Sequence, residues 1–293
     1  MNIGTYDDYN GLAIQPADGK ILVGGEYGAA TVNMVRFNTD GSVDGTFSAT
    51  PVFDGSMAYY PIVNSISVDA AGNILAGGAG MFIVAPMQVA NINFMVRYTS
   101  SGTLDTSFGN NGSLLALDPG NTDMETSMLV DSSGHILLGG QTCGATGTAG
   151  TCDTPNHFLI AEYDTFGALV PSFANGGWAV QAVGIDASRI NALAFDSNQK
   201  IVAAGTAAIY GNGENNVFAV ARYNADGSFD TTFGTNGITL TAFPLSNYVY
   251  YPGSNANAVA IQADGKIVLV GQTACNWQYC SNNIQFALAR YLP

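Results

Sequence analysis

Short hydrophobic runs and polar turns alternate along the whole chain in a pattern that occurs five times. In each unit a strand-like run leads through a tight turn into a second run that ends near Gly-Gly. A long loop, a third run ending in Arg and an aromatic residue, a Gly-containing turn and a fourth run follow. The second runs read KILVGG, NILAGG, HILLGG, KIVAAG and KIVLVG, and they begin at Lys20, Asn73, His135, Lys200 and Lys266. The anchors lie 53, 62, 65 and 66 residues apart, and such a period with four short strands per unit predicts a propeller.

The fourth unit shows how one blade is expected to form. NALAFD from Asn191 alternates small and large residues, as a half-buried strand does. KIVAAG is the second strand, and VFAVARY from Val217 is the third. Asp226-Gly227 supplies the positive φ that a hairpin turn needs before the fourth strand, ITLTAF. Four antiparallel strands of this kind make one blade.

We therefore predict an all-β fold, a five-bladed β-propeller of four-stranded antiparallel blades in one domain over residues 1–293. The chain stops after the third strand of the fifth unit, and MNIGTY at its start resembles NGITLT of the fourth unit. An N-terminal strand that completes the last blade would fasten the ring and remove its open edges. The expected blades span residues 10–56, 64–118, 126–183, 191–243, and 257–293 together with 1–6.

An offset of eight residues joins an arginine of the third strand to a following aspartate in three units. The pairs are Arg36 with Asp44, Arg97 with Asp105, and Arg222 with Asp230. In the third unit Glu162 stands at the arginine position and Val170 at the aspartate position, so both partners are lost together. We expect a structural ion pair or charge-assisted hydrogen bond across each hairpin. If the pairs are partly exposed, each contributes about 0–1 kcal/mol.

Three segments carry a resemblance to a known repeat: AIQPADGKILVGG from Ala13, VARYNADGSFDTTFGTNG from Val220 and AIQADGKIVLVG from Ala260. The chain resembles the delta-60 repeat family of bacterial surface and secreted proteins over essentially its whole length. The resemblance implies a β-propeller-like fold, and it brings no activity and no catalytic residues. The third unit departs most, with Glu162, Phe166 and Val170 where the family favours Arg, a small polar residue and Asp.

Composition favours short strands over helices, because charged residues make up only 10% of the chain and hydrophobic residues 47%. No apolar run approaches the roughly 20 residues that a membrane-spanning helix needs. The net charge is −14, and seven of the eight basic residues occupy recurring positions. Arg189 alone lies outside the pattern. No basic patch remains for nucleic acid or an anionic membrane, so neither is an expected partner.

Two cysteine pairs, Cys143 with Cys152 and Cys275 with Cys280, each lie within one long loop. A pair that closes its own loop favours a disulfide and an oxidising compartment. We therefore expect an extracellular or cell-surface protein. Unpaired thiols are one alternative, and a zinc site of four thiolates is another, although it requires loops of the third and fifth units to converge.

The long loops, which differ in every unit, are where we expect a binding site. In a propeller the loops between strands two and three, and between blades, share one face, which we call the variable face. Variable loops on a rigid scaffold usually carry function. Aromatic residues gather in these loops of blades five, one and two: Tyr9, Tyr59, Tyr60, Tyr248, Tyr250, Tyr251, Trp277 and Tyr279. Such side chains suit sugar rings and protein partners, but tyrosines also pack loops onto a scaffold, and that alternative stays open.

No metal or cofactor is expected. The pattern N-x-D-G-S-x-D at Asn38 and Asn224 loosely resembles a calcium loop, which keeps calcium as an alternative. The equivalent segments from Thr99 and Asp164 lose carboxylates and keep the turn. Asp-Gly turn geometry alone therefore accounts for the pattern.

A catalytic role is not expected either. Some five-bladed propellers are glycosidases that work with paired acids, but the innermost strands here supply acids only at their turn ends: Asp69, Asp131 and Asp196. The recurring polar residue at the strand starts is asparagine, at Asn10, Asn64, Asn191 and Asn257. We interpret the protein as a non-catalytic extracellular binding or adhesion module for a glycan or a protein, either monomeric or assembled on a surface. The alternatives are a structural subunit of a surface layer or filament and, less favoured, a glycosidase-like enzyme.

Overall fold

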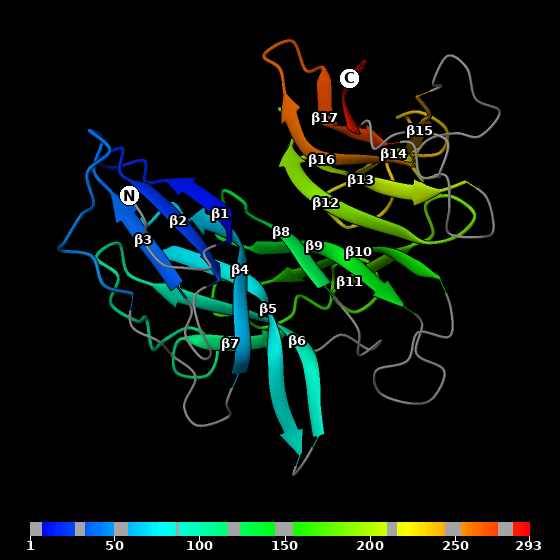
Figure 1. Ribbon diagram of the computed structural model, residues 1–293. Helices are drawn as coiled ribbons and strands as arrows, with labels where there is room; N and C mark the ends of the chain where they lie inside the picture. The colour runs from blue at the N-terminus through cyan, green and yellow to red at the C-terminus, as the bar shows by residue number, and fades with distance from the viewer. Residues whose placement is uncertain are drawn as a thin grey trace. The chain divides into compact units, whose positions relative to one another are not determined.

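A computed structural model describes residues 8–26, 33–49, 58–85, 88–116, 124–143, 155–209, 216–243, 253–274 and 284–293. This part of the chain contains 18 strands in five antiparallel sheets (Figure 1). The sheets are the blades of a five-bladed β-propeller, so the predicted fold class is confirmed. Within the same residues, no helix is long and apolar enough to cross a membrane.

Each strand pairs with its neighbour in sequence, which gives every blade a meander topology. Blade one contains β1 (Asp8–Ile14), β2 (Ile21–Glu26) and β3 (Asn33–Phe37). Blade two contains β4 (Ala58–Val68), β5 (Ile74–Ala85), β6 (Gln88–Tyr98) and β7 (Ser113–Ala116). Blade three contains β8 (Met124–Val130), β9 (Ile136–Cys143), β10 (Asn156–Tyr163) and β11 (Trp178–Gln181). Blade four contains β12 (Ser188–Phe195), β13 (Ile201–Ala208), β14 (Asn216–Tyr223) and β15 (Ile238–Thr241). Blade five contains β16 (Gly253–Ile261), β17 (Ile267–Ala274) and β18 (Ile284–Tyr291).

Blades one and five have three strands each among the described residues. The segment expected to extend blade one to residue 56 lies outside those residues, and so does the expected closing strand at residues 1–6. Contacts group the chain into two compact units. The first comprises Met1–Leu138, Ala145–Cys152 and Glu162–Val170, and the second comprises Gly139–Gly144, Asp153–Ala161 and Pro171–Pro293.

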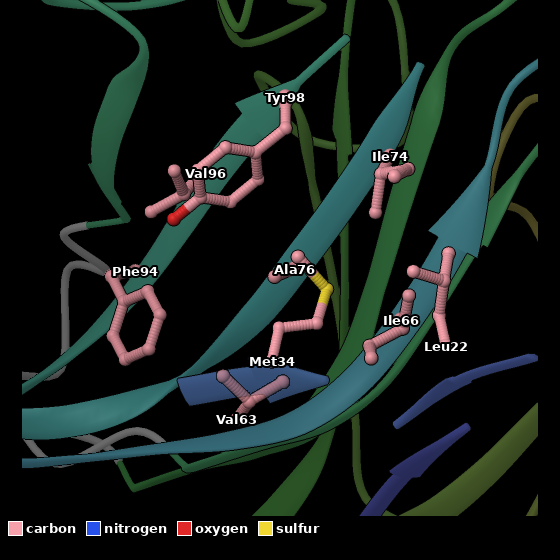
Figure 2. Packing of buried hydrophobic residues seen from close by; sticks show 9 residues of the cluster. All are labelled: Leu22, Met34, Val63, Ile66, Ile74, Ala76, Phe94, Val96 and Tyr98. Carbon is pink, nitrogen blue, oxygen red and sulfur yellow. The ribbon is translucent and has the colours of Figure 1, made fainter. Parts of the chain in front are cut away.

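Each unit has a hydrophobic core between the faces of adjacent blades. In the first unit the core joins blades one and two (Figure 2) through Leu22, Met34, Val63, Ile66, Ile74, Ala76, Phe94, Val96 and Tyr98. In the second unit the core joins blades four and five through Val202, Ala204, Phe218, Val220, Phe233, Ala256, Ile267, Leu269 and Ala287. All eight residues of β13, IVAAGTAA, are buried, and from Ala203 onward every side chain is small.

The recurring asparagines of the first strands occupy β-bulges. The strand registers shift between the two neighbours of Asn10, Asn64, Asn191 and Asn257, so each of these residues is the extra residue of a bulge in its strand. A bulge bends the strand and redirects the side chain of the extra residue. The Asn191 Nδ2 uses this freedom to donate a hydrogen bond of 2.8 Å to the Ala256 carbonyl of blade five.

The bulges also explain the glycine that ends KIVAAG and its equivalents. A Cβ added at Gly78, Gly205 or Gly271 would lie 1.9 Å from a backbone carbonyl oxygen of the first strand. These oxygens belong to Ile62, Arg189 and Asn255 respectively. The glycine is therefore required by a close backbone approach inside the sheet, as glycines within strands often are.

Candidate functional site

A polar hollow lies in the second unit, at the strand ends where the long variable loops begin and return. The register pairs Arg189 on β12 with Thr206 on β13, and Ala208 with Asn216 on β14, so these residues share one end of blade four. Blade five reaches the hollow with the start of β16, and blade three with the end of β9. The hollow measures about 200 Å³ and is lined by Gln141, Ala187, Ser188, Arg189, Thr206, Asn216 and Asn255. Six of these seven residues are polar, which suits a ligand rich in hydrogen-bonding groups.

Two hydroxyl groups in the hollow are fixed by the protein itself. The Thr206 Oγ1 donates a hydrogen bond of 2.9 Å to the Asn255 Oδ1, which ties blade four to blade five. The Ser188 Oγ donates to the Asn156 carbonyl at 3.4 Å. Both Ser188 and Thr206 are buried, so these contacts hold the lining in place.

Three other lining side chains remain available to a ligand. Gln141, Arg189 and Asn216 are half-buried, and within the part of the chain that the structure describes none has a side-chain hydrogen bond or ion pair. Together they present amide donors, amide acceptors and a guanidinium fork to the same hollow.

The hollow was not predicted from the sequence. Its residues come from three blades. Arg189 and Asn255 each lie two residues before a bulge asparagine, and Gln141 and Thr206 each follow the glycine that ends the second run, but these repeat positions do not show which side chains meet in one hollow. The available signal was Arg189, the basic residue outside the repeat positions.

The aromatic residues proposed for binding fall on parts of the chain that the structure describes incompletely. Tyr9 lies in β1, and Tyr59 and Tyr60 lie in β4, but their side chains are outside the described part. The remaining members, Tyr248, Tyr250, Tyr251, Trp277 and Tyr279, lie outside the described residues altogether. Cys143 ends β9 with its side chain outside the described part, while Cys152, Cys275 and Cys280 are not among the described residues. The aromatic surface and the disulfides thus stay predictions.

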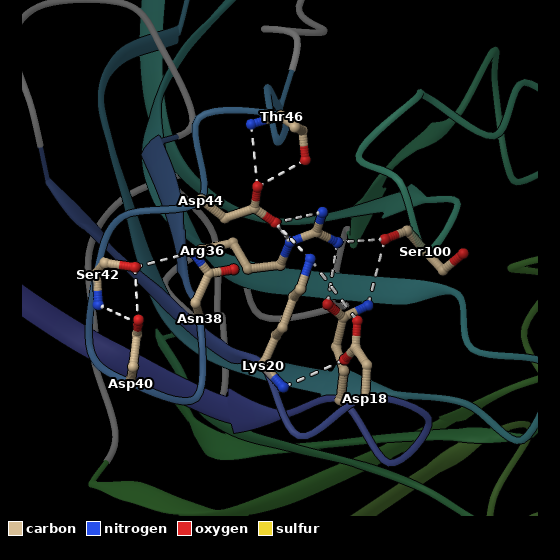
Figure 3. Close-up of polar contacts among 10 residues, drawn as sticks. Asp18, Lys20, Arg36, Asn38, Asp40, Ser42, Asp44, Thr46 and Ser100 are labelled. Atoms are coloured by element: carbon tan, nitrogen blue, oxygen red, sulfur yellow. Dashed lines mark hydrogen bonds and ion pairs between the residues drawn. The ribbon is translucent and has the colours of Figure 1, made fainter.

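The opposite ends of the blades, at the short turns, hold the arginine–aspartate pairs. In blade one the Arg36 Nε donates to the Asp44 Oδ2 at 2.8 Å, and the Lys20 Nζ reaches the same oxygen at 2.8 Å (Figure 3). The Arg36 Nη1 donates to the Ser100 carbonyl of blade two at 2.7 Å. The guanidinium also lies 4.6 Å above the Phe47 ring, a cation–π contact.

Blades two and four show the same arrangement. Nε–Oδ2 distances are 2.8 Å for Arg97 with Asp105 and 2.7 Å for Arg222 with Asp230. Their guanidinium groups lie 4.7 and 4.8 Å above the rings of Phe108 and Phe233. The Arg97 Nη1 also donates to the Thr165 carbonyl of blade three.

The energy expected for these pairs needs a correction. Arg222 is 7% exposed and Asp230 is 3% exposed, so the estimate for partly exposed pairs does not apply to them. Removing one partner of a buried pair typically costs about 3–5 kcal/mol, since the other charge stays buried without compensation. The reason for the difference is the phenylalanine ring that packs over each arginine, which the eight-residue offset does not reveal.

The aspartates of these pairs are held ionised. Hydrogen bonds from Lys20 and Thr46 hold the pKa of the Asp44 carboxyl well below its ordinary value of 3.8. At Asp230, burial alone would raise the pKa, but hydrogen bonds from Lys200, Thr232 and Arg222 outweigh it and lower the pKa well below the ordinary value. Both carboxylates therefore act as structural anions.

In blade three the acid lies on the third strand, where the other blades have arginine. His135 replaces the lysine of the second strand, Glu162 replaces the arginine, and the His135 Nδ1 lies 2.6 Å from the Glu162 Oε1. These groups and Asp131 lie within 4.8 Å of one another, in a geometry that would admit a metal ion. However, the Asp131 Oδ1 already accepts the backbone N–H groups of Ser133 and His135 at 2.8 and 2.9 Å. We interpret the cluster as the structural pair of this blade. The signal in the sequence was that the lysine and arginine positions both change in this blade, to His135 and Glu162, and the sequence analysis did not predict that these two residues pair.

Comparison with a family model agrees with the repeat. Residues 17–47, 72–108 and 197–233 match a model described as "Domain of unknown function (DUF5122) beta-propeller". These segments make up about a third of the chain. Each contains one arginine–aspartate pair and the phenylalanine beneath it, so the match follows the blades that have the complete arrangement. No curated protein matches the chain.

Solved structures share the fold at low sequence identity. A protein of unknown function from Dyadobacter fermentans DSM 18053 is 13% identical with a TM-score of 0.53, covering 96% of this chain and 79% of that one. An N-acetylgalactosamine deacetylase from F. plautii, in complex with blood group B trisaccharide, is 10% identical with a TM-score of 0.52, covering 98% and 89%. A xylan beta-1,4-xylosidase from Bacillus Halodurans C-125 is 12% identical with a TM-score of 0.47, covering 96% and 53%, so this chain spans about half its length. At these identities the likeness concerns the fold alone.

Proposed function

We propose that the protein is a non-catalytic, extracellular binding module that recognises a glycan on its variable face. The observation that carries the proposal is the hollow of Gln141, Arg189 and Asn216, whose side chains have no protein partner among the described residues. Sugar hydroxyls both donate and accept hydrogen bonds, and amide side chains offer both functions. At about 200 Å³ the hollow is smaller than typical ligand pockets of about 300–1,000 Å³. That size suits one sugar residue.

The lining favours binding over hydrolysis. Glycoside hydrolysis uses two carboxyl groups that flank the scissile bond. Among the described residues that line the hollow, none carries a carboxylate. The aromatic side chains predicted for the variable loops, with Trp277 foremost, would add stacking faces for further sugar residues.

Glycan binding is tested with an array of neutral and acidic oligosaccharides and with a matched pair of variants. Asn216→Ala removes an available amide from the hollow, and we expect affinity to fall about 3- to 10-fold, the value of one neutral hydrogen bond. Asn224→Ala makes the same change in the short turn of blade four, where the amide donates to the Ser228 Oγ. We expect this control to leave affinity unchanged.

Two results would contradict the proposal. If no glycan binds, the proposed recognition of sugars is wrong, and a protein becomes the favoured class of ligand. If light scattering instead shows reversible self-association in dilute solution, the alternative of a surface-layer or filament subunit gains support.

The extracellular assignment has a chemical test of its own. We expect peptide mapping of the non-reduced, secreted protein to show the links Cys143–Cys152 and Cys275–Cys280, each closing a loop within one blade. Because each link constrains only one surface loop, reduction should change protease cleavage within those loops more than it lowers the unfolding midpoint. Free thiols in all four positions would argue against export to an oxidising compartment.

The delta-60 assignment belongs to the same proposal. The matched family segments support a β-propeller repeat, and the quoted repeats beginning at Ala13, Val220 and Ala260 resemble those of delta-60 proteins at the bacterial surface. An extracellular adhesion role agrees with that resemblance.

A further inference from the structure

Arg189 differs from the arginines of the repeat in both position and environment. Arg36, Arg97 and Arg222 each pair with an aspartate and lie over an aromatic ring at the short-turn ends of the blades. Arg189 lies at the opposite end of blade four, in the polar hollow. Its guanidinium has no ion-pair or hydrogen-bond partner within the described residues, so its five donors are available.

A half-buried guanidinium without a counter-ion is a suitable site for an anion. The planar fork of arginine matches a carboxylate with two parallel hydrogen bonds, and such charge-assisted bonds are stronger than neutral ones. The half-buried amides of Gln141 and Asn216 line the same hollow and offer further N–H donors. No carboxylate lines the hollow among the described residues to compete for the guanidinium.

The charge of the whole chain restricts which anion is favoured. A net charge of −14 repels densely charged polyanions before they reach the hollow. A single carboxylate on an otherwise neutral saccharide feels far less of this repulsion. The hollow, at about 200 Å³, has room for one such sugar residue.

We infer that the hollow binds a uronic acid residue of a mostly neutral glycan, with the sugar carboxylate on Arg189 and its hydroxyls on Gln141 and Asn216. This inference rests on the proposed glycan-binding function and specifies its ligand class. Arg189 is then the residue that discriminates acidic sugars from neutral ones.

Calorimetry with matched sugars tests the inference. The probes are the methyl glycosides of glucuronic and galacturonic acid, their neutral partners methyl glucoside and methyl galactoside, and galactose 6-sulfate. We expect at least one uronide to bind about 10- to 100-fold more tightly than its neutral partner, the range given by a hydrogen-bonded charge. Arg189→Gln should abolish that difference, so that uronides and neutral sugars bind this variant with equal affinity. Arg189→Lys, which keeps the charge and loses the fork, should give an intermediate preference.

Arg290→Gln is the matched control, because Arg290 is an exposed arginine on β18 and its loss changes the net charge equally. We expect uronide affinity to be unchanged in this variant. Thermal melts establish that each variant is folded. If Arg189→Gln does not fold, the uronide preference measured for Arg189→Lys tests the inference instead.

Each remaining outcome overturns something specific. If uronides bind no better than neutral sugars, or if Arg189→Gln leaves their preference intact, the inference is wrong and glycan binding stands. If galactose 6-sulfate alone shows the Arg189-dependent gain, the carboxylate assignment is wrong. If none of the sugars binds and the array is also blank, the proposed function fails and the inference falls with it.

Discussion

Replacing Gly205 with alanine is expected to lower the free energy of unfolding by about 3 kcal/mol or more. The new Cβ would lie 1.9 Å from the Arg189 carbonyl oxygen and 3.0 Å from the Ile190 Cα. Both atoms belong to the backbone of the bulged strand, and every residue of β13 is buried, so neither side can move away without repacking the blade. Urea unfolding followed by far-ultraviolet circular dichroism measures the loss.

Two further glycine variants make this result interpretable. Gly271→Ala repeats the experiment in blade five, where the Asn255 carbonyl oxygen lies 1.9 Å from the added Cβ, and it should cost a similar amount. Gly45→Ala meets no atom within 4 Å, so its effect should stay within about 0.5 kcal/mol. Equal unfolding midpoints for Gly205→Ala and Gly45→Ala would show that the Arg189 carbonyl oxygen does not lie close enough to Gly205 to exclude a Cβ.

The variant Asp230→Ala, which removes the carboxylate, is expected to lower the free energy of unfolding by about 3–5 kcal/mol. Arg222 and Lys200 both donate to the Asp230 Oδ2. Without it, the buried Arg222 would keep only the longer contact of its Nη1 with the Asp196 Oδ2, at 3.9 Å. Asp226→Ala is the control in the same blade, because Asp226 is exposed and its carboxylate accepts hydrogen bonds from the backbone N–H and the hydroxyl of Ser228. We expect this control to lose much less stability than removal of the Asp230 carboxylate. Equal losses from the two variants in urea unfolding would mean that the buried pair contributes no more than an ordinary turn contact.

The same carboxylates predict the response to acid. The pKa values of Asp44, Asp105 and Asp230 are lowered from 3.8. An acid with a lowered folded-state pKa stabilises the fold above its ordinary pKa, and this contribution is lost as the pH falls towards the folded value. The unfolding midpoint should therefore be steady above about pH 5 and fall below about pH 4. The Asp230→Ala protein should show a shallower fall, because one of the responsible groups is gone.

Sequence reasoning reached the fold because the information lies close together in the chain. Asp226-Gly227 turns and alternating runs such as NALAFD define strands locally, and their fivefold recurrence defines the blade number. The eight-residue offset likewise placed Arg222 beside Asp230. The burial of that pair was beyond such reasoning, because Phe233 covers the guanidinium only after the chain has turned back.

The features that were missed depend on register between strands. A bulge at Asn191 leaves the alternating pattern of the strand recognisable, but it places the Arg189 carbonyl oxygen 1.9 Å from where a Cβ at Gly205 would lie. The hollow depends on register in the same way, since Gln141 and Asn255 lie more than 100 residues apart in the sequence and meet through separate blades. The repeat gives Arg189 and Asn255 equivalent positions in their strands, but only blade packing shows that both line one hollow.

The hydrogen bonds from Arg36 and Arg97 to the following blade have a consequence for synthesis on the ribosome. The Arg36 guanidinium finds its carbonyl acceptor at Ser100, 64 residues further along the chain. Arg97 depends in turn on Thr165, 68 residues later. A nascent first blade therefore emerges with Arg36 already beside Asp44 but without its carbonyl acceptor, and this contact forms only when the following blade has been translated. Folding intermediates of this chain should accordingly gain protease resistance in steps that each lag one blade behind elongation.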